Sequence, residues 1–387
     1  MQSVKKKKYL VILILLTAAV VLLAGYFSAS QKSAPQYLSK IDKIMFDKKN
    51  QSPKFILTLP DKNTKTSSRQ ESAKDIHKPV KVEKKIETVD DLLDIIPIVS
   101  RLPAVKGQAP LPVIEPDGNL VEKEDSLLLP QIGSDGQKPW VRYGRQAEVQ
   151  PKFYRVAVVL KNIGLDKGVT DAAITAMPSE VALSFSPYAV DAAARIKEAR
   201  TAGHETYTDL LLASRDVLKS DNGPLAMSLT LDFAGNLERL KKALAPGGAI
   251  GGMIVNDGIA DQDTREQLEK ILQELKNRGV LMVDATSNNE INTISVPGLA
   301  RKKADIVIDD GFDRESLAQR LTAAERIAQN NGLVVIVATP KPVVITALSE
   351  WFKTFSPQLS YEEMKEQNIT TIERPFALVP LSNTVVE

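Results

Sequence analysis

Apolar residues in the second half of the chain gather into short runs, and each run is followed by a stretch with helical spacing. In residues 268–275, for example, leucine and isoleucine recur at i, i+3, i+4 and i+7, which places them on one face of a helix, and Gly279 follows where a left-handed cap is needed. Asp313 is positioned to cap a second such helix, and Gly332 ends it. Strands that alternate with helices predict a parallel α/β sheet from residue 151 onward.

The strands predicted from these runs share one feature, which is that polar residues lie at or just past their ends. The strands span residues 154–160, 181–185, 205–212, 250–255, 280–283, 304–308 and 333–337. The C-terminal ends of parallel strands form the functional edge of such folds, although Asp, Asn and Ser also cap the helices that follow. We predict a functional edge, called the rim below, made by Lys161, Asn162, Asn256, Asp257, Asp284 and Thr339; Asp209, inside the strand 205–212, is counted with them because of the family resemblance given below. Ser186, Asp309 and Asp310 follow strands in the same way.

The N-terminus carries the pattern of a membrane anchor. Lys5 to Lys8 precede an uncharged apolar segment at residues 9–30, which is long enough to cross a bilayer as one helix. Basic residues favour the cytoplasmic side, so residues 1–8 are predicted to lie in the cytoplasm and the rest of the chain in the periplasm, held at the inner membrane. The alternative is a cleaved signal peptide, whose apolar region is usually about 7–15 residues long and therefore shorter than this one.

Residues 31–126 are predicted to form a flexible periplasmic stalk. Half of the 22 prolines fall between residues 31 and 150, together with a lysine-rich polar stretch, and few apolar residues there are periodic. Residues 127–150 differ, because they contain Trp140, one of only two tryptophans. We expect this arm to pack on the globular domain at residues 151–387.

Composition removes several kinds of chemistry. The formal charge of +2 lacks the strongly basic character of a nucleic-acid-binding protein. The chain has no cysteine, which excludes disulfides, thiolate metal sites and a cysteine nucleophile. Its two histidines, His77 and His204, leave little capacity for imidazole metal sites or histidine acid–base catalysis. No phosphate-binding glycine loop and no G-x-S-x-G nucleophile elbow is present.

Several stretches of the domain resemble the divergent polysaccharide deacetylase family. They are VAVVLKNIGLDKGVTDAAI, EVALSFSPYAVDAAARIKEARTAGHETYTDLLL, LEKILQELKNRGVLMVDATS and VVIVATPKP, and their order is that of the family from about residue 151 to residue 381. The segment LPQIGSDGQKPWVRYGR also looks like the lead-in of proteobacterial members. The resemblance implies an irregular (β/α) barrel with fewer than eight regular strands.

The same resemblance implies a metal site from which the ligands are missing. Metal-binding members carry an Asp-Asp pair after the first strand, where this chain has Lys161 and Asn162. Family histidines are replaced by Asp209, Asp257 and Thr339, while His204 lies at the end of a helix. Deacetylation needs a divalent metal, a carboxylate base and a histidine acid, so zinc-dependent hydrolysis is not expected.

Three functions are compatible with these features. The first is a non-catalytic, membrane-tethered domain that binds cell-envelope glycan or a periplasmic protein and needs no cofactor. The second is an active N-acetyl hydrolase in which Asp209, Asp257 and Asp284 hold Mg²⁺ or Ca²⁺, cations that prefer oxygen ligands. The third is an envelope assembly factor that acts through its stalk. The first is our preferred hypothesis.

Overall fold

The computed structural model describes part of the chain. The described residues are 55–56, 109–147, 149, 152–213, 222–228, 231–256, 258, 265–287, 289–309, 311–358, 361–367 and 371–385. They belong to the unit Lys54–Glu387, and the other unit, Met1–Pro53, lies outside them together with the predicted anchor and most of the predicted stalk. In the described part of the chain, no helix is both long enough and apolar enough to span a membrane.

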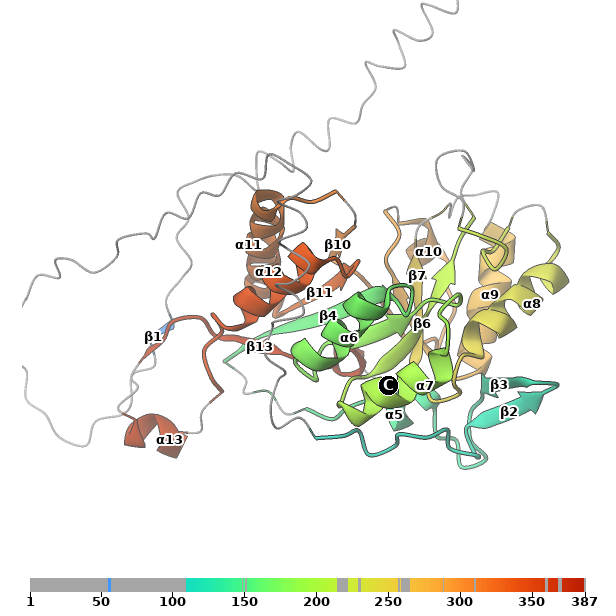
Figure 1. The fold of residues 1–387 in the computed structure, drawn as a ribbon, viewed down its shortest axis with the longest axis horizontal. Helices are drawn as coiled ribbons and strands as arrows, with labels where there is room; N and C mark the ends of the chain where they lie inside the picture. The colour runs from blue at the N-terminus through green and yellow to red at the C-terminus, as the bar shows by residue number, and fades with distance from the viewer. Residues whose placement is uncertain are drawn as a thin grey trace, which may run out of the picture. The chain divides into compact units, whose positions relative to one another are not determined.

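The domain is built on one parallel sheet with the strand order β10-β11-β4-β5-β6-β7-β8-β9 (Figure 1). Its strands are β4 Tyr154–Ile163, β5 Ala182–Phe185, β6 Thr206–Leu211, β7 Gly252–Asn256, β8 Leu281–Asp284, β9 Arg301–Lys303, β10 Ile306–Ile308 and β11 Leu333–Ala338. A further strand, β13 (Phe376–Leu378), pairs in parallel with the first residues of β4. The predicted parallel α/β sheet is therefore confirmed.

The two ends of this strand order are joined through a short irregular seam. β9 pairs with β8, and β10 pairs with β11. Between them the Ala304 N–H donates to the carbonyl of Asp284, and the Asp305 N–H donates to the carbonyl of Val335. Residues 301–308 thus lead from one end of the sheet to the other, so the sheet curls into a barrel-like fold, as the family resemblance implies. The expectation of fewer than eight regular strands is wrong, because eight strands follow one another in the order of the sheet.

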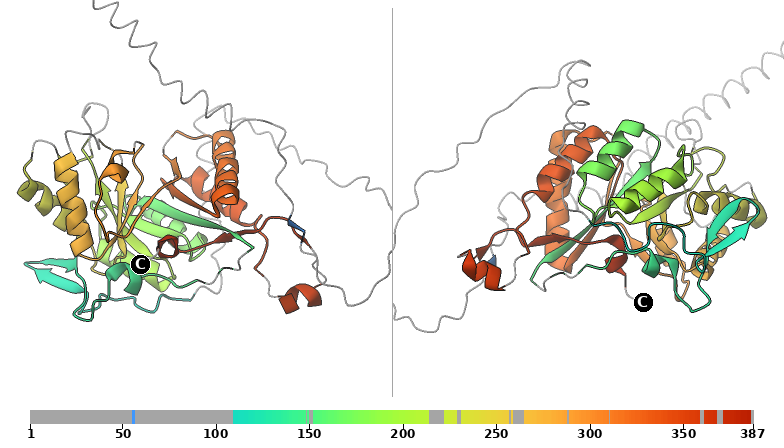
Figure 2. Two further views of the ribbon diagram at one scale, coloured as in Figure 1. Left: turned by 180° about the vertical axis from the view of Figure 1, so that it is seen from behind. Right: turned by 60° about the horizontal axis from the view of Figure 1, so that its bottom comes forward.

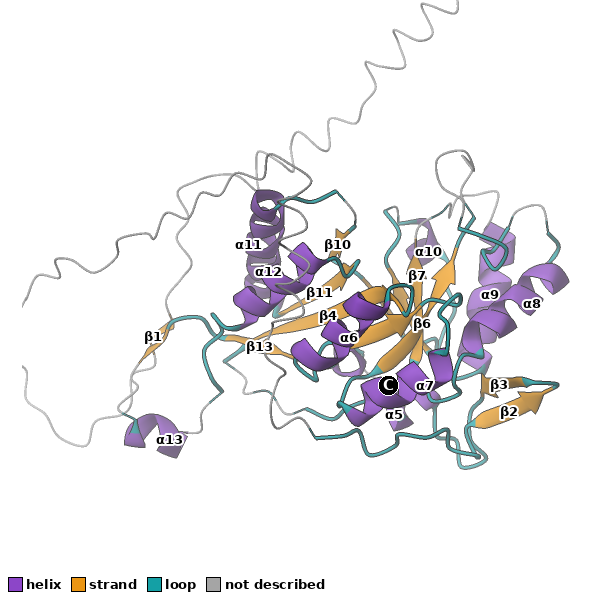
Figure 3. Cartoon of the chain, viewed as in Figure 1, coloured by secondary structure: helices purple, strands orange, loops and turns teal. Residues whose placement is uncertain are grey.

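Helices cover the outer face of the curled sheet (Figure 3). They are α6 Lys167–Ala176, α7 Ala192–Thr201, α8 Phe233–Leu244, α9 Arg265–Asn277, α11 Arg314–Asn331 and α12 Pro342–Phe352, with the shorter α10 Glu290–Thr293. A further short helix, α13 Tyr361–Glu366, belongs to the C-terminal segment and does not cover the sheet. Their apolar faces pack on alternate strand residues such as Leu183 and Leu210, which form the larger core. The side chain of Asp313 accepts a hydrogen bond from the Ser316 N–H, and Gly332 adopts φ +75°, so both predicted caps of α11 are confirmed.

The other face of the sheet looks inward and carries a second, smaller core. Val159, Tyr207 and Ile254 contribute to it from the strands, while Trp140 and Leu381 are added from the arm and the C-terminal segment. Trp140 lies on α5 (Pro139–Arg142) and is 6% exposed. A main-chain hydrogen bond joins its N–H to the carbonyl of Gly279, just before β8. The arm is drawn in teal in the two further views of Figure 2.

The folded arm starts earlier than the predicted boundary at residue 127. Residues 109–126 are described with it, and they include β2 (Val121–Glu124), which forms a hairpin with β3 (Leu127–Pro130). Leu120 is fully buried against Tyr143 and Ala249. The separate pair β1 (Phe55–Ile56) and β12 (Thr371–Ile372) is antiparallel.

Candidate functional site at the carboxyl edge of the sheet

Neighbouring strands place polar side chains on the inner face of the sheet at its carboxyl edge. Side chains alternate between the two faces of a strand, so a residue two positions after an inner-face residue points inward as well. Val159, Ala182, Tyr207 and Ile254 belong to the inner core. The residues two positions later are Lys161, Ser184, Asp209 and Asn256. The rim therefore gathers an ammonium, a hydroxyl, a carboxyl group and an amide on one face.

A β-bulge in β4 shapes this group. The register between β4 and β5 shifts between Leu160 and Ile163, so that Lys161 and Asn162 together lie opposite Ser184. Asn162 adopts φ +59°, a left-handed conformation that asparagine tolerates better than most residues. Its backbone N–H donates to Asp209 Oδ2 at 2.8 Å. The bulge thus turns a main-chain donor of β4 toward a carboxyl group on β6.

Asp209 has no exposed surface, and its carboxyl group faces the inside of the curled sheet. Besides Asn162, it accepts a hydrogen bond of 2.6 Å from the Ser184 hydroxyl to its other oxygen. Burial raises the pKa of Asp209 to about 6, although the hydrogen bonds from Ser184 and Asn162, the charge of Lys161 and the nearby Asn256 amide act to lower it. Both oxygens of this carboxyl group are therefore engaged by the protein itself.

Lys161 supplies a buried positive charge beside Asp209. Only 2% of its surface is exposed, and its Nζ lies 2.6 Å from Oδ1 of Asp309, whose side chain is 43% exposed. The Thr339 hydroxyl donates to the same Asp309 oxygen at 3.4 Å. Asp309 thus links two of the predicted rim residues. Asp309 is not among the predicted site residues, although it follows a strand. The observation that points to it is the buried lysine, which needs a counter-ion.

Asn256 ends β7 and is 3% exposed. It approaches the carboxyl group of Asp209 closely enough to act on its pKa. By the geometry of a hydrogen bond, however, neither its amide nitrogen nor its amide oxygen has a partner among the described residues. The amide is thus a buried donor and acceptor pair that the described fold leaves unsatisfied.

Asp284 lies at the same edge of the sheet but on its opposite face. In the register of the sheet it is aligned with Val255, which belongs to the outer core, whereas Asp209 is aligned with the inner-face residue Ile254. Its carboxylate accepts hydrogen bonds from the N–H and hydroxyl of Thr286, at 2.9 and 2.6 Å, and from the Asn292 amide, and the Lys303 ammonium lies 3.5 Å away. The fold therefore does not bring Asp284 together with Asp209.

The remaining predicted ligand, Asp257, lies outside the described residues. Among the residues that are described, no group of three or more His, Asp or Glu side chains is arranged to hold a metal ion. The predicted cation site of Asp209, Asp257 and Asp284 stays a prediction.

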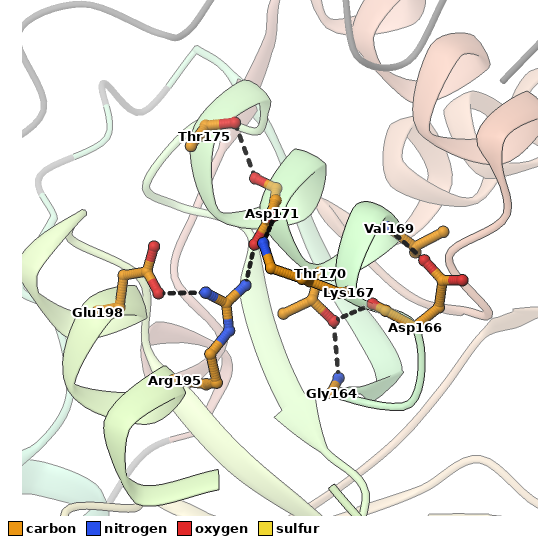
Figure 4. A network of polar contacts seen from close by, with 9 residues as sticks. All are labelled: Gly164, Asp166, Lys167, Val169, Thr170, Asp171, Thr175, Arg195 and Glu198. Atoms are coloured by element: carbon orange, nitrogen blue, oxygen red, sulfur yellow. Dashed lines mark hydrogen bonds and ion pairs between the residues drawn. The ribbon is translucent and has the colours of Figure 1, made fainter. Parts of the chain in front are cut away.

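The loop that follows β4 is held by a polar network (Figure 4). The Gly164 N–H donates to the Thr170 hydroxyl at 2.9 Å, and Asp166 caps α6 by accepting from the Val169 N–H. Further along α6, Asp171 forms an ion pair of 2.6 Å with Lys167 and another with Arg195 of α7. These contacts fix the connection between the rim and the two helices that follow it.

His204 lies at the other edge of the sheet, before β6 begins. It is fully buried, and its Nδ1 and Nε2 lie 2.8 and 3.0 Å from the carbonyl oxygens of Val181 and Ile174. Burial lowers its pKa, although both carbonyl contacts act to raise it. The histidine joins a strand to a helix, and it is remote from the rim along the strand direction.

Sequence reasoning missed a second polar cluster at this amino edge. Glu205 is buried and accepts hydrogen bonds from the Arg145 N–H at 2.7 Å, the Tyr207 hydroxyl at 3.0 Å and the Ser382 N–H at 3.1 Å. Arg200, with no exposed surface, donates to the carbonyls of Val113 and Tyr143. These contacts tie the arm and the C-terminal segment to the sheet, and their partners are too distant in sequence for local patterns to reveal them.

A curled parallel sheet covered by helices, with polar residues at the carboxyl ends of its strands, defines an α/β barrel-like protein. Residues 158–361 match the family described as divergent polysaccharide deacetylase, and the chain belongs to this family.

Similar proteins are found in two bacteria. The solved structure of an uncharacterized protein from Agrobacterium tumefaciens C58 is 24% identical to the chain, covers 67% of it and 100% of its own length, and superposes with a TM-score of 0.58. An uncharacterized protein of Haemophilus influenzae is 22% identical over 201 residues, which are 50% of this chain and 69% of that protein. The structural likeness shows the fold alone.

Proposed function

We propose that this protein is a membrane-tethered, periplasmic member of the divergent polysaccharide deacetylase family that binds a cell-envelope glycan and does not hydrolyse it. The apolar segment at residues 9–30 behind Lys5 to Lys8 supports the tether. The rim supports the binding, because it gathers polar side chains of neighbouring strands, among them the buried Lys161, Asp209 and Asn256, at one edge of the sheet.

One observation carries the non-catalytic part of this proposal, namely the ion pair between Lys161 and Asp309. By the family resemblance, Lys161 and Asn162 take the places of the Asp-Asp pair that supplies a base and a metal ligand. A charged lysine does not accept a proton from water, and its ammonium, 2.6 Å from Asp309, brings positive charge where a cation would need negative ligands.

The other described rim residues do not fit a divalent metal either. The two oxygens of Asp209 accept hydrogen bonds from Ser184 and Asn162. Asn256 offers an amide oxygen, which is a weaker ligand than a carboxylate, and Asp284 faces the opposite side of the sheet. We therefore derive no reaction step through a metal at this site.

Catalysis is tested by an acetate-release assay. Purified full-length protein is incubated with chitooligosaccharides and with peptidoglycan fragments, with added Zn²⁺, Mg²⁺ or Ca²⁺ and in a parallel series with EDTA. The proposal expects no acetate above the buffer control in either series. Acetate release that EDTA abolishes, and that is also lost in Asp209→Asn, would instead establish the hydrolase alternative.

The tether is tested by cell fractionation. Full-length protein is expected in the inner-membrane fraction, resistant to extraction by alkaline carbonate, and open to protease added from the periplasmic side. A shortened, soluble periplasmic form would show that residues 9–30 act as a cleaved signal, and would overturn the membrane part of the proposal while leaving the binding part in place.

A further inference from the structure

Asn256 is the rim residue whose polar atoms the fold leaves without a partner. It lies on the inner face at the end of β7, beside Asp209, and 3% of its surface is exposed. No described residue bonds to its amide nitrogen or oxygen. A buried polar group without a hydrogen bond costs about 1–3 kcal/mol, so a position that keeps both a donor and an acceptor unpaired calls for an explanation.

The neighbours of Asn256 are committed to contacts within the protein. Asp209 uses one oxygen for Ser184 and the other for the Asn162 N–H, while the Lys161 ammonium is paired with Asp309. Ligand recognition at this point of the inner face thus falls to the amide of Asn256, which is uncharged and presents one donor group and one acceptor side by side.

The charge around Asn256 narrows the ligand class. Two carboxyl groups, Asp209 and Asp309, share the single ammonium of Lys161, so a carboxylate or phosphate on a ligand would meet net negative charge at neutral pH. An amide matches a pair of adjacent hydroxyls instead, because each hydroxyl both donates and accepts a hydrogen bond. The arrangement favours an uncharged polyhydroxyl group.

Exposed apolar side chains stand at the same edge of the sheet. Leu165 follows β4 and is 57% exposed, and Val190 follows β5 and is 77% exposed. Between them in sequence, Tyr188 is fixed through its hydroxyl, which donates to the carbonyl of Asn222 and accepts from the Leu225 N–H. Small-molecule sites combine an apolar surface with a few placed polar groups, and the carbon-bound hydrogens of a sugar ring suit such a surface.

Building on the proposed function, we propose that Asn256 is the specificity-determining residue of the rim and that it recognises the hydroxyl groups of a neutral glycan. The amide pairs with two hydroxyls of one sugar ring, which satisfies the donor and the acceptor that the fold leaves open. The proposal makes the site selective for neutral sugars over sugars that carry a carboxylate.

The test compares wild-type protein with Asn256→Leu, a change of similar size that removes the amide. Full-length protein in a detergent without a sugar headgroup is titrated calorimetrically with the N-acetylglucosamine tetramer and with an oligogalacturonate tetramer. We expect the wild type to bind the neutral tetramer. Its affinity for the anionic tetramer should be at least tenfold lower. We expect Asn256→Leu to bind the neutral tetramer at least tenfold more weakly than the wild type.

Stability separates loss of recognition from loss of folding. Removing an unpaired buried amide is neutral or favourable, so the melting temperature of Asn256→Leu is expected to equal or exceed that of the wild type. The matched control is Thr208→Val, which removes another buried polar atom without a partner. Thr208 is aligned with the outer-core residue Met253 and so lies on the opposite face of the sheet from Asn256, and the change should leave binding unchanged.

The outcomes are distinguishable. If the wild type binds the neutral tetramer and Asn256→Leu binds it equally well, the role of Asn256 is wrong and the proposed glycan binding stands. If the wild type binds the anionic tetramer more tightly than the neutral one, the selectivity is wrong. If the wild type binds neither, both the inference and the proposed function are overturned.

Discussion

The ammonium of Lys161, 2% exposed, lies 2.6 Å from the carboxylate of Asp309, which is 43% exposed. The pair is asymmetric, because one partner is enclosed by the barrel and the other still reaches solvent. Lysine is rarely buried unless a counter-ion accompanies it. The rim of this protein is therefore organised around an internal positive charge, and the carboxyl groups of Asp309 and Asp209 lie around that charge.

The asymmetry predicts unequal effects of removing each partner. Asp309→Asn leaves a buried ammonium without its ion-pair partner and should cost about 3 kcal/mol of unfolding free energy. Lys161→Met leaves a carboxylate that water can solvate and fills the space of the lysine stem, so its cost should be about 1 kcal/mol. Urea denaturation of both variants measures the difference. Equal costs, or a larger cost for Lys161→Met, would contradict the asymmetry.

The raised pKa of Asp209 predicts a pH dependence of stability. Its pKa is about 6 in the folded protein and 3.8 in an unperturbed chain, so between these values the folded state holds the proton more tightly. Stability due to this group is present at pH 4 and is lost as the pH rises through 6. A shift of this size corresponds to about 3 kcal/mol between pH 3.5 and pH 7.

Asp209→Asn removes the titration and is the control for this measurement. The unfolding free energy of the wild type minus that of Asp209→Asn is expected to fall as the pH rises from 4 to 7. A difference that stays constant over this range would show that Asp209 titrates normally.

The left-handed conformation of Asn162 predicts which residues the bulge tolerates without loss of stability. With φ +59°, Asn162→Gly should keep the stability of the wild type to within a few tenths of a kcal/mol, because glycine adopts this conformation freely. Asn162→Ala should lose about 1 kcal/mol, because alanine keeps the Cβ that disfavours this conformation and lacks the short polar side chain with which asparagine offsets it. Thermal melting decides the point, and equal melting temperatures for the two variants would count against a backbone constraint.

The contacts of Arg200 predict that this side chain holds the arm on the domain. Its guanidinium donates to the carbonyls of Val113 and Tyr143, and its ring contact places Cζ 5.1 Å from the Tyr143 centroid. Lysine does not span two carbonyls in this geometry, so Arg200→Lys should cost about 2 kcal/mol and should speed amide exchange in residues 111–143. The control is Arg195→Lys on the same helix, whose ion pairs with Asp171 and Glu198 do not involve the arm. An unchanged exchange rate in Arg200→Lys would show that the arm is held elsewhere.

Much of the fold could be predicted from apolar runs, because β4, β5, β7, β8 and β11 are largely buried and most of their residues are apolar. The seam could not, since β9 consists of Arg301, Lys302 and Lys303, whose side chains are half-buried and carry no apolar signal. The hairpin of the arm follows a proline-rich stretch whose composition resembles that of a linker, and its burial depends on distant partners such as Ala249.

For the site, the rim was predictable and its details were not. The sequence places polar residues at strand ends, but it does not show which face of the sheet each one occupies. A shift of one residue exchanges the two faces, and in the sheet register Asp284 faces the helices while Asp209 faces inward. The bulge at Asn162 and the pairing of Lys161 with Asp309 arise from tertiary contacts between segments far apart in the chain. Local patterns contain no information on either.

The central claim is that the rim binds a neutral glycan without a metal and leaves it intact. The most direct measurement is a calorimetric titration of full-length protein with the N-acetylglucosamine tetramer in excess EDTA, followed by mass spectrometry of the recovered sugar. The account predicts saturable binding and recovery of the fully acetylated tetramer. Binding that requires an added divalent cation, or recovery of a deacetylated product when that cation is present, would contradict it.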